Sequence, residues 1–438
     1  MSDVTIQPTG SPLDRALRIF ADVRPGEGAH AVLMFFNVFL LLLAYYILKT
    51  VREPLILTTG GAELKSYAAG AQAAVLLAYV PLYGMLMSRL SRSTLLVTVV
   101  IAFVACIELF FAGGLAGVPY LGFVFYVWVG IFSLTMIAQF WSFANDVYSR
   151  EEGDRLFPLI AVGSTAGAPL GAAAAQSLFA RGVSPWAMMQ IAAGLLVLHL
   201  VLYTRVWSRP SQSAADAKPS KSGGFSLVLS DPYLRLVALL LVLLNIVNST
   251  GEFILARLVT ERAAELAAAS AEFNRGAFIG QFYGSYFFWV NVASVVLQAF
   301  LVSRVVKRFG FKGALLTLPI LACGAYGLAA LGAGLTAVRI IKTAENSADY
   351  SMMNTAKQML WLPTTREQKF KAKQAIDTFF VRTGDLLSAA VVFVGTHYAT
   401  LGPGGFAITN VVIVTLALLV AFRLAAAYAR LTKQPAQA

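Results

Sequence analysis

The stretch that decides the fold is residues 31–54, AVLMFFNVFLLLLAYYILKTVREP, an apolar run that ends in charged residues. About 20 predominantly apolar residues in a helix are enough to cross the hydrocarbon core of a bilayer. Lys49, Arg52 and Glu53 follow one another at helical spacing, which places them on one face. A charge in hydrocarbon costs roughly 2.5–3.5 kcal/mol, so such a face normally lines a bundle interior or a water-filled path. The stretch therefore predicts a membrane span with a polar, functional face.

Other apolar stretches of the chain carry the same kind of polar stripe. These stripes are Gln139/Ser142/Asp146, Asn245/Asn248/Glu252 and Lys342/Glu345/Asp349. In the span count given below, the four stripes fall on the first, fourth, seventh and tenth spans. A polar stripe on every third span is what a transporter built from repeated three-helix units shows. The pattern predicts a solute carrier with a hydrophilic central cavity.

Composition favours a membrane protein throughout. Hydrophobic residues make up 58% of the chain, charged residues 13%, and the mean hydropathy is +0.71. Soluble domains are typically about 45–50% apolar and about 25% charged. We predict an all-α polytopic membrane protein with twelve transmembrane helices, at residues 30–53, 66–88, 94–113, 120–147, 157–180, 185–206, 233–256, 280–303, 313–332, 334–357, 374–397 and 406–429.

The predicted spans fall into two groups around a linker rich in Ser, Ala, Lys and Gly. The predicted parts are an N-terminal segment (1–29), an N-terminal six-helix bundle (30–207), the linker (208–228) and a C-terminal six-helix bundle (229–438). Arg and Lys concentrate in the segments on one side, so both termini and the linker are predicted to be cytoplasmic. This bias accounts for most of the +12 net charge, so the basic charge does not indicate that the protein binds nucleic acid. We expect a multi-pass protein of a bacterial inner membrane. It is expected to be monomeric, and its partners are expected to be its substrate and the membrane lipid.

Two short basic segments half a chain apart suggest an internal repeat. They are MSRLSR at 87–92 and VSRVVKR at 302–308, at the ends of the second and eighth spans. Short cationic loops at these positions resemble the layout of the major facilitator superfamily. That resemblance implies two pseudo-symmetric six-helix halves that transport by alternating access.

Three groups of motifs are distributed over the chain. The first is KTVREPLILTTGGAE (49–63), and the second is FWSFAN (140–145) with RLFP (155–158). The third consists of DYS (349–351), KQMLWLP (357–363), KFKAKQAID (369–377) and RTGD (382–385). In their sequences and order, these motifs resemble a narrower family, the ATP/ADP translocases of intracellular bacteria and plastids and their bacterial relatives.

The resemblance implies exchange of nucleotides by antiport, although the motifs depart from the family at particular positions. Arg52 stands where energy-exchanging members carry a lysine, and Asn354-Thr-Ala replaces Asp-Pro-Thr. Gln358 replaces a glutamate. The chain has no phosphate-loop sequence, so a nucleotide would be bound as a substrate by side chains in the cavity.

The candidate substrate-binding residues are ionisable or amide side chains of the polar spans and of the motifs. They are Lys49, Arg52, Glu53, Asn145, Asp146, Asn248, Glu252, Lys342, Glu345, Asn346, Asp349, Lys357, Asp377, Arg382 and Asp385. Structural roles compete with this interpretation: lysine and arginine at a helix end can snorkel to head groups, and asparagines can hydrogen-bond between helices. Pro54 predicts a break in the first span.

The charged pairs also suggest gates. Arg52/Glu53 with Glu252/Arg257 would close the periplasmic side, and Asp146/Arg150 with Asp349/Lys357 the cytoplasmic side. Glu108 is interpreted either as a proton-coupling carboxylate or as the buried partner of a cation.

The cations of the spans favour an anionic substrate, because lysine and arginine suit phosphate and carboxylate groups. The alternative to a nucleotide carrier is a major-facilitator-type carrier of another organic anion or a lysolipid, with or without proton coupling. A membrane enzyme is disfavoured, since the chain has no catalytic Ser/His/Asp set, metal-ligand cluster or cofactor motif. We therefore predict no catalytic residues, no metal and no cofactor.

Overall fold

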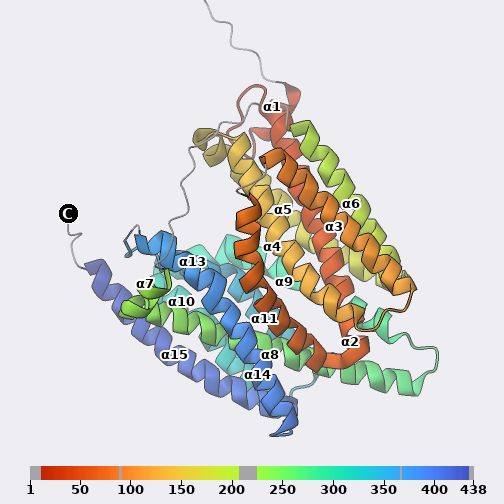
Figure 1. Ribbon diagram of the computed structural model, residues 1–438. Helices are drawn as coiled ribbons and strands as arrows, with labels where there is room; N and C mark the ends of the chain where they lie inside the picture. The colour runs from red at the N-terminus through yellow and green to blue at the C-terminus, as the bar shows by residue number, and fades with distance from the viewer. Residues whose placement is uncertain (1–10, 88–90, 207–223, 366, 434–438) are drawn as a thin grey trace, which may run out of the picture. The chain divides into compact units, whose positions relative to one another are not determined.

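The computed structural model describes residues 11–87, 91–206, 224–365 and 367–433. Every regular element in these ranges is helical (Figure 1). Nine helices of the described part are long and apolar enough to cross a membrane. Parts of the predicted N-terminal segment (1–10), linker (208–223) and C-terminal end (434–438) lie outside the described residues.

Figure 1 shows the helices, numbered in chain order. They are α1 (Pro12–Leu17), α2 (Gly28–Met87), α3 (Arg92–Leu115), α4 (Leu121–Val147), α5 (Arg150–Ala180), α6 (Pro185–Val206), α7 (Gly224–Ser230), α8 (Pro232–Ala269), α9 (Arg275–Val296), α10 (Ser303–Ala330), α11 (Leu335–Ala348), α12 (Asn354–Met359), α13 (Lys373–Ala375), α14 (Val381–His397) and α15 (Pro403–Lys433). Turns of π-helix occupy Leu297–Val302, Asp349–Met353, Gln368–Ala372 and Ile376–Phe380.

Two of the long helices are interrupted at glycines. In α2 the helical conformation is lost at Gly60 and Gly61, and in α10 it is lost at Gly310. Gly61 and Gly310 have φ angles of 64° and 62°, which a glycine adopts without steric cost. The predicted break at Pro54 is wrong, because Pro54 lies inside α2. Membrane helices tolerate an interior proline where neighbouring groups satisfy the freed backbone carbonyl.

Contacts divide the chain into two compact units, which are described separately here. Within the described residues, the first unit comprises residues 11–51, 91–119 and 129–206. The second unit comprises residues 52–87, 120–128, 224–365 and 367–433. The boundary between Val51 and Arg52 falls within α2, so this helix contributes to both units.

In the first unit, α5 packs closely on the beginning of α2 through glycines spaced four residues apart. These glycines, Gly163, Gly167 and Gly171, lie on one face of α5. A Cβ on Gly167 would lie 2.5 Å from the carbonyl oxygen of Phe39, and one on Gly171 would lie 2.6 Å from that of Leu43. Real Cβ atoms do not approach so closely. The small residues therefore permit backbone-to-backbone contact between the two helices.

Hydrogen bonds connect the segment at the start of α2 to α1 and α5. The carboxylate of Asp14 accepts hydrogen bonds from the amides of Gly26 and Gly28, which lower the pKa of Asp14 to about 2. Arg155 at the start of α5 donates to both oxygens of Glu27, at 2.8 and 3.0 Å. These bonds hold the segment before α2 against the beginning of α5.

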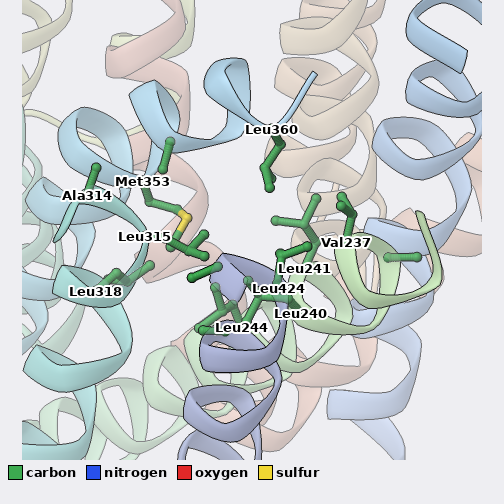
Figure 2. Close-up of a cluster of buried hydrophobic side chains, with 14 of the residues drawn as sticks. Val237, Leu240, Leu241, Leu244, Ala314, Leu315, Leu318, Met353, Leu360 and Leu424 are labelled. Atoms are coloured by element: carbon green, nitrogen blue, oxygen red, sulfur yellow. The ribbon is translucent and has the colours of Figure 1, made fainter. Parts of the chain in front are cut away.

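The core of the second unit lies where α8, α10 and α15 pack together. Figure 2 shows part of this buried cluster, with leucines of α8 facing α10 and α15. Leu240, Leu315 and Leu424 are fully buried within it. The helix α8 also packs along α14. This packing fixes α8, which carries one of the predicted polar stripes.

Candidate functional site

Six charged side chains form a continuous row in the second unit, in which cations and carboxylates alternate. Neighbours in the row are between 2.7 and 3.8 Å apart. The side chains come from α2, α8 and α11, and we call them the charge row: Arg52, Glu53, Lys65, Glu252, Lys342 and Glu345. Cations and carboxylates are equal in number, so the row as a whole is neutral.

The first part of the charge row is centred on Glu53, which is fully buried. Its Oε1 accepts from Nη2 of Arg52 at 2.7 Å and from Nε at 3.1 Å, and its Oε2 is 2.8 Å from Nζ of Lys65. The Arg52 guanidinium lies 4.0 Å from the centre of the Tyr126 ring of α4. One carboxylate thus pairs with two cations, and an aromatic face covers one of them.

Lys65 links α2 with α8 and α9. Besides its ion pair with Glu53, its Nζ donates to the hydroxyl of Tyr283 at 3.2 Å and is 3.8 Å from Oε2 of Glu252. The ammonium group also lies 4.5 Å from the centre of the Tyr283 ring. Because its side chain is only 7% exposed, Lys65 is a buried part of the row.

Glu252 of α8 is the middle carboxylate. Its Oε1 accepts from the hydroxyl of Tyr286 at 2.7 Å and from Nδ2 of Asn346 at 3.0 Å. The same oxygen is 3.8 Å from Nζ of Lys342. Glu252 therefore receives its hydrogen bonds from neutral groups and lies at longer range between two ammonium groups.

Lys342 and Glu345 of α11 form the last part of the row. Nζ of Lys342 is fully enclosed and donates to Oε2 of Glu345 at 2.9 Å and to Oδ1 of Asn248 at 2.8 Å. The hydroxyl of Tyr326 donates to the same Glu345 oxygen at 2.7 Å. A Cβ on Gly251 would lie 3.1 Å from Nζ of Lys342 and would overlap the Tyr326 hydroxyl. Glycine at this position therefore makes room for the buried lysine.

Helical spacing explains why these residues meet. Asn248, Gly251 and Glu252 lie three and four residues apart on α8, and Lys342, Glu345 and Asn346 do so on α11. The structure thus brings together seven of the predicted site residues: Arg52, Glu53, Asn248, Glu252, Lys342, Glu345 and Asn346. Arg52 and Lys342, two cations among the predicted substrate-binding residues, are both paired with carboxylates in this structure.

A small cavity of about 50 Å³ adjoins the charge row between α8, α10 and α11. Asn248 and Glu345 line it, together with Asp349 and Lys357, which form an ion pair at 3.2 Å. Small-molecule sites commonly measure about 300–1,000 Å³, so this cavity cannot enclose a nucleotide in the present conformation.

The predicted residues of α14 form a separate polar contact with α8. Oδ1 of Asp385 accepts from Asn245 at 2.8 Å and from Ser249 at 2.9 Å. Its Oδ2 is 3.4 Å from Nη1 of Arg382. Asp377 is exposed and makes no ion pair with the residues that the structure describes. These contacts fit a helix-packing role for Asp385.

The remaining predicted site residues belong to the first unit. Nζ of Lys49 lies 5.1 Å from the centre of the Tyr46 ring and is half-buried. Asn145 is exposed and Asp146 is half-buried. Glu108 is exposed and accepts a hydrogen bond from Gln190 at 3.0 Å. Its interpretation as the buried partner of a cation is therefore wrong.

Sequence reasoning missed Lys65 and the tyrosines of the charge row. Lys65 was expected in a loop, because a break was expected at Pro54. The tyrosines Tyr283, Tyr286 and Tyr326 lie in apolar stretches where aromatic residues usually pack. Arg257 was expected to join Glu252, but it donates to Glu261 at 3.1 Å and to the Leu401 carbonyl at 2.9 Å. It lies more than one helical turn beyond Glu252, so its side chain reaches the connection between α14 and α15 instead.

Solved structures share this fold. A nucleoside transporter, NupG, matches with a TM-score of 0.65 and 13% identity, covering 91% of this chain and 99% of its own. A peptide transporter, POT, in complex with sulfate, matches with a TM-score of 0.63 and 13% identity, covering 96% and 99%. The chain therefore shares its fold with these two transporters.

Comparison of the sequence with known families and proteins identifies the family of this chain. The model of the TLC ATP/ADP transporter family matches residues 15–113 and 118–329. The chain belongs to the TLC ATP/ADP transporter family, a transporter family, as the motifs predicted. ADP,ATP carrier protein 1 of Chlamydia muridarum is 26% identical over 429 residues, which is 80% of this chain and 79% of the relative. ADP,ATP carrier protein 1 of Chlamydia trachomatis is 27% identical over 305 residues, which is 60% of this chain. The match spans only 56% of that carrier's length.

Proposed function

We propose that this protein is a secondary transporter that exchanges nucleotides across the bacterial inner membrane by alternating access. The observation that carries the proposal is the family match over residues 15–113 and 118–329, together with relatives named ADP,ATP carrier proteins. The cations of the charge row support it, since a phosphate group binds well to lysine and arginine in a confined site. The nucleotide is the substrate, and no resident cofactor is required.

A binding screen on the purified protein tests the choice of substrate. A ligand that binds only the folded state raises its apparent melting temperature with concentration. ADP and ATP should stabilise the protein, whereas organic anions without phosphate and lysolipids should not. Stabilisation by lysolipids alone would favour the alternative, a major-facilitator-type carrier of an amphiphilic anion.

We propose twelve spans arranged as two six-helix halves, residues 30–207 and 229–438, joined by a cytoplasmic linker. The breaks at Gly60–Gly61 and at Gly310 support this arrangement. They divide α2 and the continuous helical segment Arg275–Ala330, which comprises α9, a π-helical turn and α10, each into two lengths that can cross a bilayer separately. The predicted tenth span corresponds to α11, a π-helical turn and α12. The working unit is proposed to be a monomer in lipid.

The orientation can be tested with accessible tags. The excess of basic residues on one side places the N-terminus, Ser220 and the C-terminus in the cytoplasm, and Glu265 in the periplasm. Tags at the first three positions should be inaccessible to a membrane-impermeant reagent in intact cells, while a tag at Glu265 should react. Labelling of Ser220 from outside would overturn the arrangement.

We propose that the candidate residues divide between substrate contact and gating. The charge row is proposed to close the periplasmic side, and Asp349 with Lys357 to help close the cytoplasmic side. Lys49, Asn145, Asp146, Asp377, Arg382 and Asp385 are proposed to contact the substrate or support the gates. The ion pairs of each gate engage only when that side is shut.

A disulfide across the proposed periplasmic gate should arrest transport. A Cβ on Gly70 of α2 would lie 2.9 Å from the Cβ of Ala389 of α14, which is closer than the roughly 3.5–4.5 Å of a disulfide, so cysteines at these two positions can form a disulfide after a small outward shift of the two helices. In a background with Cys106 and Cys323 replaced by serine, Gly70→Cys with Ala389→Cys should lose uptake on oxidation. A reductant should restore it. Full cross-linking with unchanged uptake would show that α2 and α14 do not separate during the cycle.

A further inference from the structure

The carboxylates of the charge row differ in how they contact the lysines. Glu53 is 2.8 Å from Nζ of Lys65, and Glu345 is 2.9 Å from Nζ of Lys342, both direct ion pairs. Glu252 lies between the same two lysines, 3.8 Å from each. Each lysine thus has a close carboxylate of its own, and Glu252 is a second, more distant anion shared by both.

Glu252 is also the most accessible carboxylate of the row. Its side chain is 23% exposed, compared with 0% for Glu53 and 4% for Glu345. Its hydrogen bonds come from Tyr286 and Asn346, which are neutral donors. Its two ammonium neighbours are each 3.8 Å away, whereas Glu53 and Glu345 have an ammonium group at 2.8 and 2.9 Å, and Coulomb attraction weakens with distance. Of these carboxylates, Glu252 is therefore the one whose side chain can leave its place at least cost.

The charge balance of the row requires an anion at this place. Without Glu252, the remaining five groups comprise three cations and two carboxylates, Glu53 and Glu345. One positive charge would then be uncompensated in a buried environment, where an unpaired charge is costly. Any anion of suitable size that enters between Lys65 and Lys342 would restore neutrality.

We propose that Glu252 is a built-in counter-anion that occupies the place of a phosphate group of the transported anion. This inference rests on the proposed function and identifies Lys65 with Lys342 as the phosphate-binding pair. Entering phosphate displaces the Glu252 carboxylate, because two anions cannot share the space between the ammonium groups without repulsion. When no substrate is bound, Glu252 returns, and the charge row closes as observed here.

The proposal predicts that removing the charge of Glu252 strengthens anion binding. In Glu252→Gln the side chain keeps its shape and can still bond Tyr286, but phosphate no longer competes with a carboxylate. The affinity for ADP and for inorganic pyrophosphate should rise about tenfold or more, as expected for a charge-assisted contact in a confined site. Isothermal titration of the purified full-length protein measures both affinities.

The matched control is Glu261→Gln, the same substitution on the same helix at an exposed pair with Arg257. Its affinities should equal those of the unmodified protein. Tyr286→Phe provides a second variant that keeps every charge and removes one donor to Glu252. Tyr286→Phe should also raise the affinities for ADP and pyrophosphate, but by a smaller factor than Glu252→Gln.

The outcomes separate this inference from the proposed function. Binding of ADP by the unmodified protein, with no gain in folded Glu252→Gln or in Tyr286→Phe, would overturn the counter-anion and leave nucleotide exchange standing. Tighter pyrophosphate binding in Glu252→Gln, without any ADP binding, would support the counter-anion and refute the nucleotide substrate. Pyrophosphate binding by neither protein would overturn the counter-anion. If Glu252→Gln does not fold, Tyr286→Phe tests the proposal instead: a higher pyrophosphate affinity than that of the unmodified protein supports the counter-anion, and an unchanged affinity overturns it.

Discussion

Replacing Lys342 with methionine should destabilise the folded protein by about 3–5 kcal/mol and abolish nucleotide exchange. Removal of one partner from a buried ion pair leaves the other charge uncompensated, and this has a cost of that size. Lys342 is fully buried, and its loss leaves Glu345 without its close ion-pair partner and the Asn248 amide oxygen without the lysine donor. The apparent melting temperature in detergent, read from a fluorescent size-exclusion profile, should fall clearly below that of the unmodified protein.

A compensating variant shows whether charge balance causes the loss. In Lys342→Met with Glu345→Gln the remaining groups of the charge row are again neutral, and the new amide can still bond the Tyr326 hydroxyl. Most of the lost stability should return, while exchange should stay absent because the phosphate-binding cation is missing. A double variant no more stable than Lys342→Met would argue against charge balance as the cause.

Neutralising Glu53 should have an effect of similar size at the other end of the charge row. In Glu53→Gln, Arg52 and Lys65 lose the carboxylate that pairs with both of them, and two buried cations remain close together. Breaking such a buried pair costs roughly 3–5 kcal/mol. We expect a large drop in the melting temperature, with loss of exchange in the fraction that remains folded.

The control for this variant is again Glu261→Gln. Glu261 pairs with Arg257 at 3.1 Å, but its side chain is 49% exposed. Exposed ion pairs typically contribute about 0–1 kcal/mol. A melting temperature that falls equally in Glu53→Gln and Glu261→Gln would show that burial of the charge row does not determine its contribution.

The all-helical membrane character and the polar faces of α8 and α11 could be predicted from the sequence, because both depend on local patterns. Apolar runs of sufficient length indicated helices that can cross a membrane. The spacing of Asn248 with Glu252 and of Lys342 with Glu345 placed each pair on one helix face. Family motifs gave the transporter family, since their order extends over nearly the whole chain.

The contacts between helices within the charge row could not be predicted, because they depend on packing between distant segments. Lys65 follows the break at Gly60 and Gly61, and nothing local shows that its ammonium group reaches Glu252. In the sequence, Tyr286 cannot be distinguished from an aromatic residue that only packs, because its bond to Glu252 joins α9 to α8. The pairs of Arg52 with Glu53 and of Lys342 with Glu345 are local, whereas the approach of Lys342 to Glu252 joins α11 to α8.

Exchange in reconstituted vesicles is the most direct test of the central claim. Vesicles containing the purified protein and loaded with ADP should take up labelled ATP faster than vesicles loaded with buffer alone. Lys342→Met should reduce this uptake to the level of protein-free vesicles, whereas Glu261→Gln should retain it. Labelled ATP uptake by folded, unmodified protein that does not exceed uptake by protein-free vesicles would contradict nucleotide exchange.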